Sequence, residues 1–352
     1  MRDIYFFLPD YPEYSTGGIM YLQKLYEYVN NHSIHVNKFG EFRFVKITRR
    51  SRILKPIIGF YYICKIPRNS IIIITNTEYF YFLLPKILLG FWKKHFYYMI
   101  ICHLTSEEKK KFYRDYFEHI FIKKSEYQTT ISDATLKSLI ENKLIDKEIE
   151  VIQPGIDYKP LDSLPVKDNK IFKILYVGSI EERKGLIFAI NAMNLIKNMN
   201  FKFYIAGRIL NKDYYDLLVY KINEYGLGSK IIFLGKVTDE ELTNLYTSSH
   251  LFLFLSTWEG YGMVLAEASS FGVPIVASKL PSFYTMLDDG YNGYYVDYYN
   301  KEIIAEIISS LMKNVELRND LSKNALNKAK SFKSWDFICS MHLKNLNILR
   351  EK

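Results

Sequence analysis

Short apolar runs alternate with segments of helical periodicity along most of the chain. Residues 251–255 (LFLFL) and 273–277 (VPIVA) are almost wholly apolar, which is typical of strands buried on both faces of a parallel sheet. Residues 263–270 between them are rich in Ala, Leu and Glu and predict a helix, and Gly272 stands where such a helix would end. Strand, loop, helix and strand make a βαβ unit, so a ligand is expected outside the carboxyl ends of its strands.

The same alternation recurs on both sides of this unit. It predicts strands at residues 3–8, 70–74, 96–102, 171–177, 201–206, 231–235 and 294–296. It predicts helices at residues 19–29, 79–92, 134–141, from residue 186, at 239–248, twice within 302–330, and at 336–350. A polar stretch with Pro160 and Pro165 is interpreted as a linker. The pattern predicts an α/β protein of two doubly wound, Rossmann-like domains, residues 1–165 and 166–335.

The main candidate binding groups lie in and next to the loop between the first strand of the βαβ unit and its helix. Its glycines and the helix N-terminus offer backbone N–H groups that suit an anion such as phosphate. Glu259 and Glu267 flank this turn, and carboxylates repel phosphate but accept hydrogen bonds from hydroxyl groups. A nucleotide-sugar, with phosphate in the middle and hydroxyls at both ends, fits this arrangement. The alternative is a helix N-terminus with a solvated Glu in its first turn.

Other loops, at the ends of predicted strands, contain further candidate site residues. Gly17 and Gly18 would let backbone amides approach a ligand closely, although such a pair can also be only a turn. Arg183 and Lys184 lie in the glycine-bounded loop GSIEERKG, where they could clamp a diphosphate or form a solvated basic turn. His103 ends another predicted strand and is either a site residue or a structural histidine.

The segment EGYGMVLAE (259–267), followed by GVPIV (272–276), resembles the E-x7-E signature of family 4 glycosyltransferases, which have the GT-B fold. The resemblance extends over nearly the whole chain and is strongest over residues 171–296. It implies two Rossmann-like domains facing across a cleft, with the helix at 336–352 packing back on the first, acceptor-side domain. It further implies a retaining hexosyltransferase that uses a nucleotide-diphosphate sugar, needs no metal or other cofactor, and acts on a glycan or lipid-linked acceptor.

Site residues carry over by position from this resemblance. The residues implied in catalysis are Glu259, His103, Lys184 and Arg183. Those implied in donor binding are Gly17, Gly18, Gly178, Ser179, Gly207, Arg208, Gly260, Tyr261, Gly262, Met263, Val264 and Glu267. Within these sets Glu259 would contact the sugar hydroxyls and Glu267 the ribose. The family usually has Arg where this chain has Ser179, so Arg183 is expected to supply the second positive charge on the diphosphate.

Composition narrows the class of protein. A chain of 352 residues with 49% hydrophobic and 24% charged residues can form two domains with full cores. Cys64, Cys102 and Cys339 are far apart, which argues against a disulfide framework or zinc site and favours a reducing compartment. The apolar stretch at residues 4–8 is too short for a signal peptide, and no run of about 18 apolar residues predicts a membrane span. We therefore expect a cytoplasmic protein.

The net charge of +9 is unevenly distributed. Residues 1–160 carry 24 Lys and Arg against 17 Asp and Glu, whereas residues 161–352 carry 23 against 21. The basic first half could face an anionic acceptor or the inner face of a membrane as a peripheral protein, or be a solvated surface. No nucleic-acid motif accompanies the charge, so no nucleic-acid partner is expected.

Three other functions stay open at this point. A phosphorylase or a sugar-nucleotide epimerase could use a related fold, and the epimerase would need no acceptor. A non-catalytic nucleotide-sugar binder would explain Ser179 in place of a cation. A membrane-surface scaffold would explain the basic first half, but it would have no use for Glu259 and Glu267.

Overall fold

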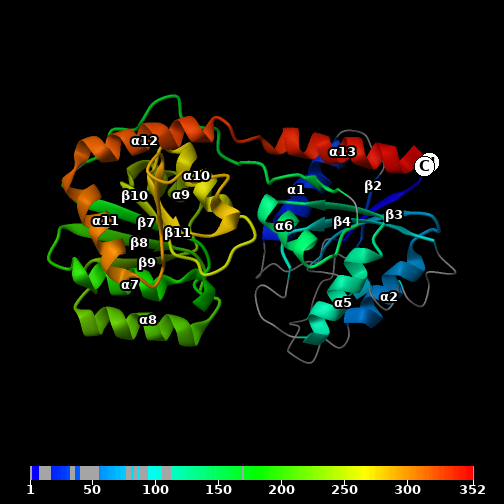
Figure 1. The fold of residues 1–352 in the computed structure, drawn as a ribbon, viewed down its shortest axis with the longest axis horizontal. Coiled ribbons are helices and arrows are strands. Elements are labelled where there is room, and N and C mark those ends of the chain that lie inside the picture. The colour runs from blue at the N-terminus through cyan, green and yellow to red at the C-terminus, as the bar shows by residue number, and fades with distance from the viewer. Residues whose placement is uncertain are drawn as a thin grey trace. The chain divides into compact units, whose positions relative to one another are not determined.

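The computed structural model of the chain divides into two compact units. Unit 1 comprises Met1–Gly155 with Lys333–Lys352, and unit 2 comprises Ile156–Phe332. The structure describes residues 2–7, 17–31, 36–39, 55–76, 81–82, 86, 94–104, 112–146, 148–168 and 170–351. Each unit is an α/β domain built on its own parallel sheet (Figure 1).

Unit 1 has a six-stranded sheet in the order β2-β1-β3-β4-β5-β6, with every described pairing parallel. Its strands are β1 (Ile4–Phe7), β2 (Val36–Phe39), β3 (Ile71–Thr75), β4 (Phe96–Ile101), β5 (Tyr127–Thr130) and β6 (Glu150–Val151). Its helices are α1 (Gly17–Asn31), α2 (Lys55–Lys65), α5 (Phe112–Lys123), α6 (Asp133–Glu141) and α13 (Trp335–Glu351). The central strands are apolar on consecutive positions because helices cover both faces of the sheet.

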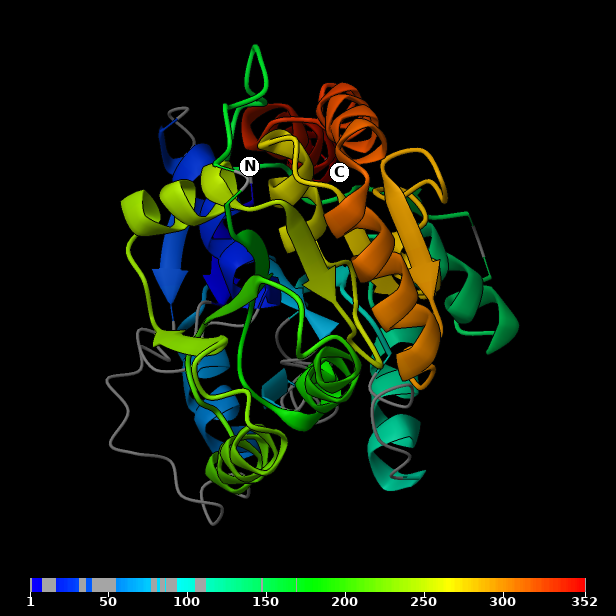
Figure 2. The same cartoon turned by 90° about the vertical axis from the view of Figure 1, so that its left-hand side faces the viewer.

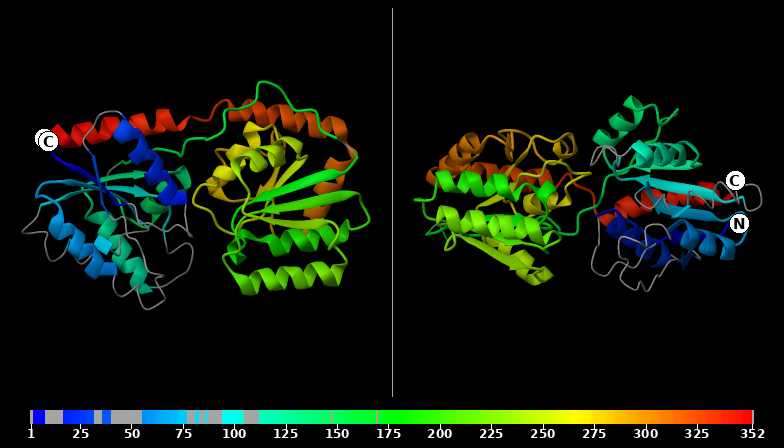
Figure 3. Two further views of the ribbon diagram at one scale, coloured as in Figure 1. Left: turned by 180° about the vertical axis from the view of Figure 1, so that it is seen from behind. Right: turned by 90° about the horizontal axis from the view of Figure 1, so that it is seen from below.

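The last helix of the chain belongs to unit 1. Helix α13 packs on α1, as the red and dark-blue ribbons show in Figure 3. A buried polar chain ties the two helices to the sheet: the Tyr21 hydroxyl lies 2.7 Å from Nε2 of His342, and the Tyr98 hydroxyl lies 2.6 Å from Nδ1 of the same ring. On the other face of the sheet, α2 and α5 contribute to a second apolar core that includes Ile63 and Phe121.

Unit 2 has the strand order β12-β11-β10-β7-β8-β9, again with parallel pairings. Its strands are β7 (Phe172–Val177), β8 (Phe201–Ala206), β9 (Ile231–Gly235), β10 (Leu251–Phe254), β11 (Ile275–Ser278) and β12 (Gly293–Val296). Its helices are η3 (Glu182–Lys184), α7 (Leu186–Leu195), α8 (Lys212–Tyr225), α9 (Asp239–Ser248), α10 (Met263–Ser270), η4 (Pro281–Phe283), α11 (Lys301–Lys313) and α12 (Val315–Ala329).

The helices of unit 2 form a layer on each face of the sheet. Helices α7 and α8 lie side by side on one face, and Figure 2 shows both close to end-on. Helices α9, α10 and α12 lie on the other face (Figure 1). The strand order reverses between β7 and β10, which are hydrogen-bonded neighbours. Ligands of open α/β sheets bind at such a switch point, outside the carboxyl ends of the strands.

Several predicted elements coincide with the observed ones, including β8, β9, α9 and α10. Helices α2 and α8 and strand β2 were not predicted. Most of the helix expected at residues 79–92 lies outside the described residues. The boundary between the units falls at Gly155, not at residue 165, because the following segment joins unit 2, where the Leu161 N–H donates to the Ser270 carbonyl at 3.0 Å.

Candidate active site

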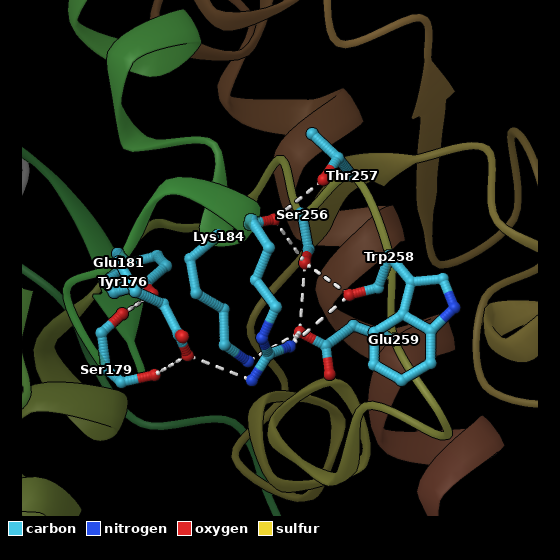
Figure 4. A network of polar contacts seen from close by, with 9 residues as sticks. Tyr176, Ser179, Glu181, Lys184, Ser256, Thr257, Trp258 and Glu259 are labelled. Atoms are coloured by element: carbon cyan, nitrogen blue, oxygen red, sulfur yellow. Dashed lines mark hydrogen bonds and ion pairs between the residues drawn. The ribbon is translucent and has the colours of Figure 1, made fainter. Parts of the chain in front are cut away.

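Glu259 is the centre of a polar cluster at the switch point of unit 2 (Figure 4). Its Oε1 accepts hydrogen bonds from Nζ of Lys184 at 2.5 Å and from NH1 of Arg183 at 3.0 Å. Oγ of Ser256 lies 2.9 Å from the same oxygen. The cations follow β7 and the carboxylate follows β10, so the adjacency of these two strands brings them together.

The turn that carries the cations is shaped by a glycine. Arg183 and Lys184 end the short helix η3, and Gly185 after them has φ +66°. A Cβ at Gly185 would stand 1.9 Å from the Leu255 carbonyl oxygen, so the turn lies directly against the end of β10. The Arg183 carbonyl also accepts from the Thr257 N–H at 2.8 Å, which holds the two loops together.

Arg183 is shared between two carboxylates. Its NH2 lies 3.0 Å from Oε1 of Glu181, in addition to the contact of NH1 with Glu259. The Ser179 hydroxyl donates to the same Glu181 oxygen at 2.6 Å, and the Tyr176 hydroxyl donates to the Ser179 carbonyl at 2.7 Å. Ser179 therefore does not replace the charge of a cation, but it orients the carboxylate that holds Arg183.

The electrostatic balance favours an ionised Glu259. Burial acts to raise the pKa of Glu259, but the charges of Lys184 and Arg183 and the hydrogen bonds from Lys184 and Ser256 outweigh it. The pKa of Glu259 consequently lies below the ordinary value for a glutamate. The side chains of Glu259 and Lys184 are each only 11% exposed, so the pair lies in a region that water screens weakly.

Helix α10 begins at a second constrained glycine. Gly262 is its N-cap with φ +93°, and a Cβ there would lie 2.5 Å from Cε1 of Phe283. The helix has no side-chain cap, so the first-turn N–H groups at Met263 and Val264 are available in the way an anion site requires. Gly260 and Tyr261 complete the loop between Glu259 and this helix.

Glu267 lies one turn into α10 and forms a different contact. Its Oε2 accepts a hydrogen bond from the Tyr246 hydroxyl at 2.9 Å. Tyr246 is fully buried and stacks on Phe271 at 5.1 Å between ring centroids. Burial raises the pKa of Glu267 to about 7, opposed by the Tyr246 hydrogen bond and reinforced by Asp157 and Asp239. Glu267 therefore changes charge close to neutral pH.

Two more glycines bring neighbouring loops into contact at the same edge of the sheet. A Cβ at Gly207 would stand 1.8 Å from the Gly178 carbonyl oxygen. The Ile180 N–H donates to the Arg208 carbonyl at 2.8 Å, which joins the loops after β7 and β8. The Arg208 side chain is exposed.

The remaining predicted residues belong to unit 1. Gly17 and Gly18 begin α1, and a Cβ at Gly18 would lie 3.2 Å from Sγ of Cys102 at the end of β4. His103 follows Cys102 and is half-buried. The start of α1 and the end of β4 are therefore neighbours within this unit.

A buried asparagine that the sequence analysis did not single out fixes the backbone at His103. Asn76 follows β3, donates from Nδ2 to the His103 carbonyl, and donates to Oε1 of Glu118 at 2.7 Å. Its Oδ1 accepts from the Cys102 N–H at 2.9 Å. Its position directly after a buried strand is a signal that could have identified it, and the same applies to Ser256 after β10.

In the described part of the chain, no three His, Cys, Asp or Glu side chains group in a way that could hold a metal ion. No helix within the described ranges has the length and apolar character needed to span a membrane.

A model of a known protein family matches most of unit 2. Residues 162–328 match the family model described as glycosyl transferases group 1. This segment is similar to glycosyl transferases group 1, which agrees with the predicted enzyme class.

Relatives match over different shares of their length. An uncharacterized glycosyltransferase of Methanocaldococcus jannaschii is 28% identical over 363 residues, which cover 95% of this chain and 86% of that protein. Several other curated relatives match over only about half of their own length, between 44% and 57%.

Solved structures confirm the predicted fold. Sucrose-phosphate synthase of Thermosynechococcus elongatus has a TM-score of 0.83 at 16% identity, with both chains covered fully at 100%. HepE of Anabaena, solved in complex with UDP-glucose, has a TM-score of 0.76 at 17% identity and covers 99% of this chain and 100% of its own. The chain thus consists of two Rossmann-like domains of the GT-B type.

Proposed function

We propose that this chain transfers a hexose from a nucleotide-diphosphate sugar to a hydroxyl group of a glycan or lipid-linked glycan, with retention at the anomeric carbon. The observation that carries the proposal is the contact of Glu259 with Arg183 and Lys184 at the switch point of unit 2. Such a donor needs cations for its diphosphate and a hydrogen-bond acceptor for its sugar hydroxyls, and this cluster supplies both.

Donor binding would exchange partners within the cluster. The diphosphate would draw Arg183 and Lys184, and the Glu259 carboxylate would then accept hydrogen bonds from the sugar. The two cations and the amides at the start of α10 would stabilise the charge that develops on the leaving diphosphate. Glu267 would accept from the ribose hydroxyls, and the backbone at Gly178 and Gly207 would allow the nucleotide to approach closely.

Transfer with retention requires one bond to break and one to form on the same face of the sugar. The bond from the anomeric carbon to the diphosphate breaks, and the bond to the acceptor oxygen forms. The acceptor proton passes to a leaving phosphate oxygen. We propose this front-face course, with an oxocarbenium-like sugar between the two events.

Unit 1 would bind the acceptor. By the resemblance to family 4 enzymes, we assign Gly17 and Gly18 to the donor phosphates and His103 to the donor sugar. Asn76 supports the last assignment because it holds the His103 carbonyl in place.

We propose that the reaction needs no metal, since Arg183 and Lys184 can neutralise a diphosphate themselves. Activity that persists in a chelator such as EDTA would support this, and activity restored only by a divalent cation would contradict it.

We also propose that the protein works in the cytoplasm, at the inner face of a membrane that carries its acceptor. The excess of Lys and Arg in residues 1–160 supports this. Sedimentation with anionic vesicles should fall as salt rises, whereas sedimentation that ignores both lipid charge and salt would count against a membrane surface.

The donor is tested by thermal unfolding with UDP, GDP, ADP and dTDP and their common sugars. UDP-glucose comes first because the HepE structure holds it. A ligand that binds only the folded protein stabilises it by about 2.7 kcal/mol at a hundredfold excess over Kd. NMR of the product anomer, with acceptor glycans supplied, then tests transfer and retention. No shift with any donor would overturn the proposal.

A nucleotide-sugar binder without turnover is the second candidate. The observation in its favour is that Glu181 and Glu259 share Arg183, which lowers the charge available to the diphosphate. Thermal shift with a donor but neither transfer nor donor hydrolysis would select this alternative.

A further inference from the structure

A cavity of about 210 Å³ lies in unit 2 at the amino-terminal edge of the sheet. Residues 164–167, before β7, form one wall, and the first turns of α12 form the other. His250, immediately before β10, also lines it. Because β10 is parallel to β7, this cavity opens at the edge opposite to Glu259, which follows the carboxyl end of the same strand. It is therefore separate from the candidate active site.

His250 lines this cavity and has a buried ring nitrogen without a hydrogen-bond partner among the described residues. His250 is only 1% exposed, and its ring stacks on that of Phe172 with 5.2 Å between the ring centroids. The Lys173 N–H donates to Nδ1 at 3.0 Å, so in the neutral ring the proton resides on Nε2. Within the described residues, Nε2 has no hydrogen-bond partner. A buried N–H without an acceptor costs free energy, so a site with this feature calls for a ligand that accepts.

Two cations line the same cavity. Arg318 is 5% exposed, donates from NH1 to the Leu311 carbonyl at 2.7 Å, and lies over the Phe172 ring. Lys167 is half-buried, and burial, followed by the charge of Arg318, lowers its pKa to about 8. Burial, then Lys167 and Arg318, likewise lowers the pKa of His250 to about 4, so its ring stays neutral near pH 7.

Negative charge near these groups is slight. Among the described residues that line the cavity there is no Asp or Glu. The carboxyl that acts on the pKa of His250 is that of Asp168, which is exposed and accepts from the Lys170 N–H at 2.9 Å. The cavity is thus lined by a lysine, an arginine and a neutral histidine, together with apolar side chains such as Leu164 and Val315.

We propose that this cavity is a second ligand site that binds a small phosphate-bearing compound. A phosphate group has three oxygens and close to two negative charges, which matches two cations and one neutral donor better than a single carboxylate does. A bound phosphate would accept from Nε2 of His250 and would link Lys167 of the segment before β7 to Arg318 of α12. The apolar wall leaves room for an organic group attached to the phosphate.

The test observes His250 directly by NMR of protein labelled with ¹⁵N-histidine. Inorganic phosphate is titrated against chloride at constant ionic strength, and the His250 signal is assigned by its loss in His250→Gln. We expect the Nε2–H resonance of His250 to move and saturate with phosphate but not with chloride. Phosphate that binds only at Arg183 and Lys184 would leave this resonance unchanged, so the donor site cannot imitate the result.

Matched variants sharpen the test. Lys167→Met should weaken phosphate binding at His250 by about tenfold, the effect of losing one charge-assisted hydrogen bond. Lys170→Met makes the same change of charge at an exposed position outside the cavity and should leave the affinity unchanged. Glucose 1-phosphate and glycerol 1-phosphate, titrated in the same way, distinguish a sugar phosphate from a lipid headgroup by their relative affinities. A His250 resonance that no phosphate compound moves in the unmodified protein would overturn the proposal, as would equal affinity in Lys167→Met.

Discussion

Nζ of Lys184 lies 2.5 Å from Oε1 of Glu259, although 75 residues separate them in the chain. The two residues follow neighbouring strands, β7 and β10, and Ser256 holds the same carboxylate oxygen from the second strand. Under the proposed function, Lys184 would bind the diphosphate and Glu259 the sugar, and the two side chains would neutralise each other until a donor separates them. Because both side chains take part in this exchange, we expect replacement of either Lys184 or Glu259 to impair transfer.

Lys184→Met should abolish most transfer with little loss of folded protein. The methionine keeps the length of the side chain but removes the charge that we assign to the leaving diphosphate, and loss of such a group costs about 10²- to 10³-fold in kcat. Steady-state kinetics with the identified donor measures the effect. Lys212→Met removes an equally charged but exposed partner of Asp216 and should leave kcat unchanged. Equal activity of Lys184→Met and wild type would remove Lys184 from the proposed role.

Gly262→Ala should destabilise unit 2 and weaken donor binding. The substitution strains a backbone with φ +93° and places a Cβ 2.5 Å from the Phe283 ring. We expect a loss of about 2–4 kcal/mol in the free energy of unfolding, from the strain and the overpacking together. Urea-induced unfolding measures it. The control is Gly226→Ala, which has φ +70° but no atom within 4 Å of the added Cβ, so it isolates the strain. Equal losses in both variants would contradict a steric role for Phe283.

Nucleotide affinity should rise as pH increases through about 7. Glu267 has its pKa raised to about 7 by burial, and only the carboxylate form accepts well from two ribose hydroxyls. Below this pH the protonated side chain loses that capacity, so Kd should increase. Calorimetric titration of the nucleotide between pH 5.5 and 8.5 measures the profile, and Glu267→Gln should flatten it. A wild-type profile as flat as that of the variant would refute the assignment.

The same group should make stability depend on pH in the opposite direction. The folded pKa of about 7 exceeds the ordinary value of 4.5, so the folded protein binds more protons between these values. The contribution of Glu267 to the free energy of unfolding is therefore fully present below 4.5 and is lost as pH rises towards 7. Thermal unfolding of wild type and Glu267→Gln across this range checks the sign. A difference between them that is independent of pH would show that the carboxyl does not titrate there.

Asn76→Ala should destabilise unit 1 and disturb His103. It removes the donor to the His103 carbonyl and to the fully buried Glu118, and it removes the acceptor for the Cys102 N–H. We expect a loss of about 2–4 kcal/mol, since buried polar groups lose partners. Chemical unfolding followed by tryptophan fluorescence measures it. Asn142→Ala, which loses an exposed bond to the Ser138 carbonyl, should cost under about 1 kcal/mol. Similar losses of unfolding free energy in both variants would show that the buried hydrogen bonds of Asn76 stabilise unit 1 no more than the exposed bond of Asn142 does.

Local sequence was sufficient to predict a strand or helix where its burial pattern and its capping residues lie within that one element. Strands β8 and β9 are mostly apolar runs at the observed positions, and helix α9 is capped by Thr238, whose side chain forms a capping box with Glu241. Helix α8 carried similar signals, with Asn211 as N-cap and Gly226 after its end, and could have been predicted from them. Helix α2 offered no such signal: it is rich in aromatic and β-branched residues, and a Cβ at its Gly59 would lie 1.6 Å from the Tyr81 carbonyl oxygen, a contact between distant segments.

By itself, the sequence determined the α/β class, most of the strands and helices, and which residue types were available for the proposed sugar-nucleotide site, because hydrophobic period, caps and glycines act over a few residues. The tertiary structure decided which of these residues meet. The strand order places Lys184 against Glu259 and Asn76 against His103, and the packing of α9 beside α10 places Tyr246 against Glu267. The Leu161 bond to Ser270 ties the segment after Gly155 to unit 2. Burial, which produces the shifted pKa of Glu267, arises only when distant segments pack together, so no local pattern contains it.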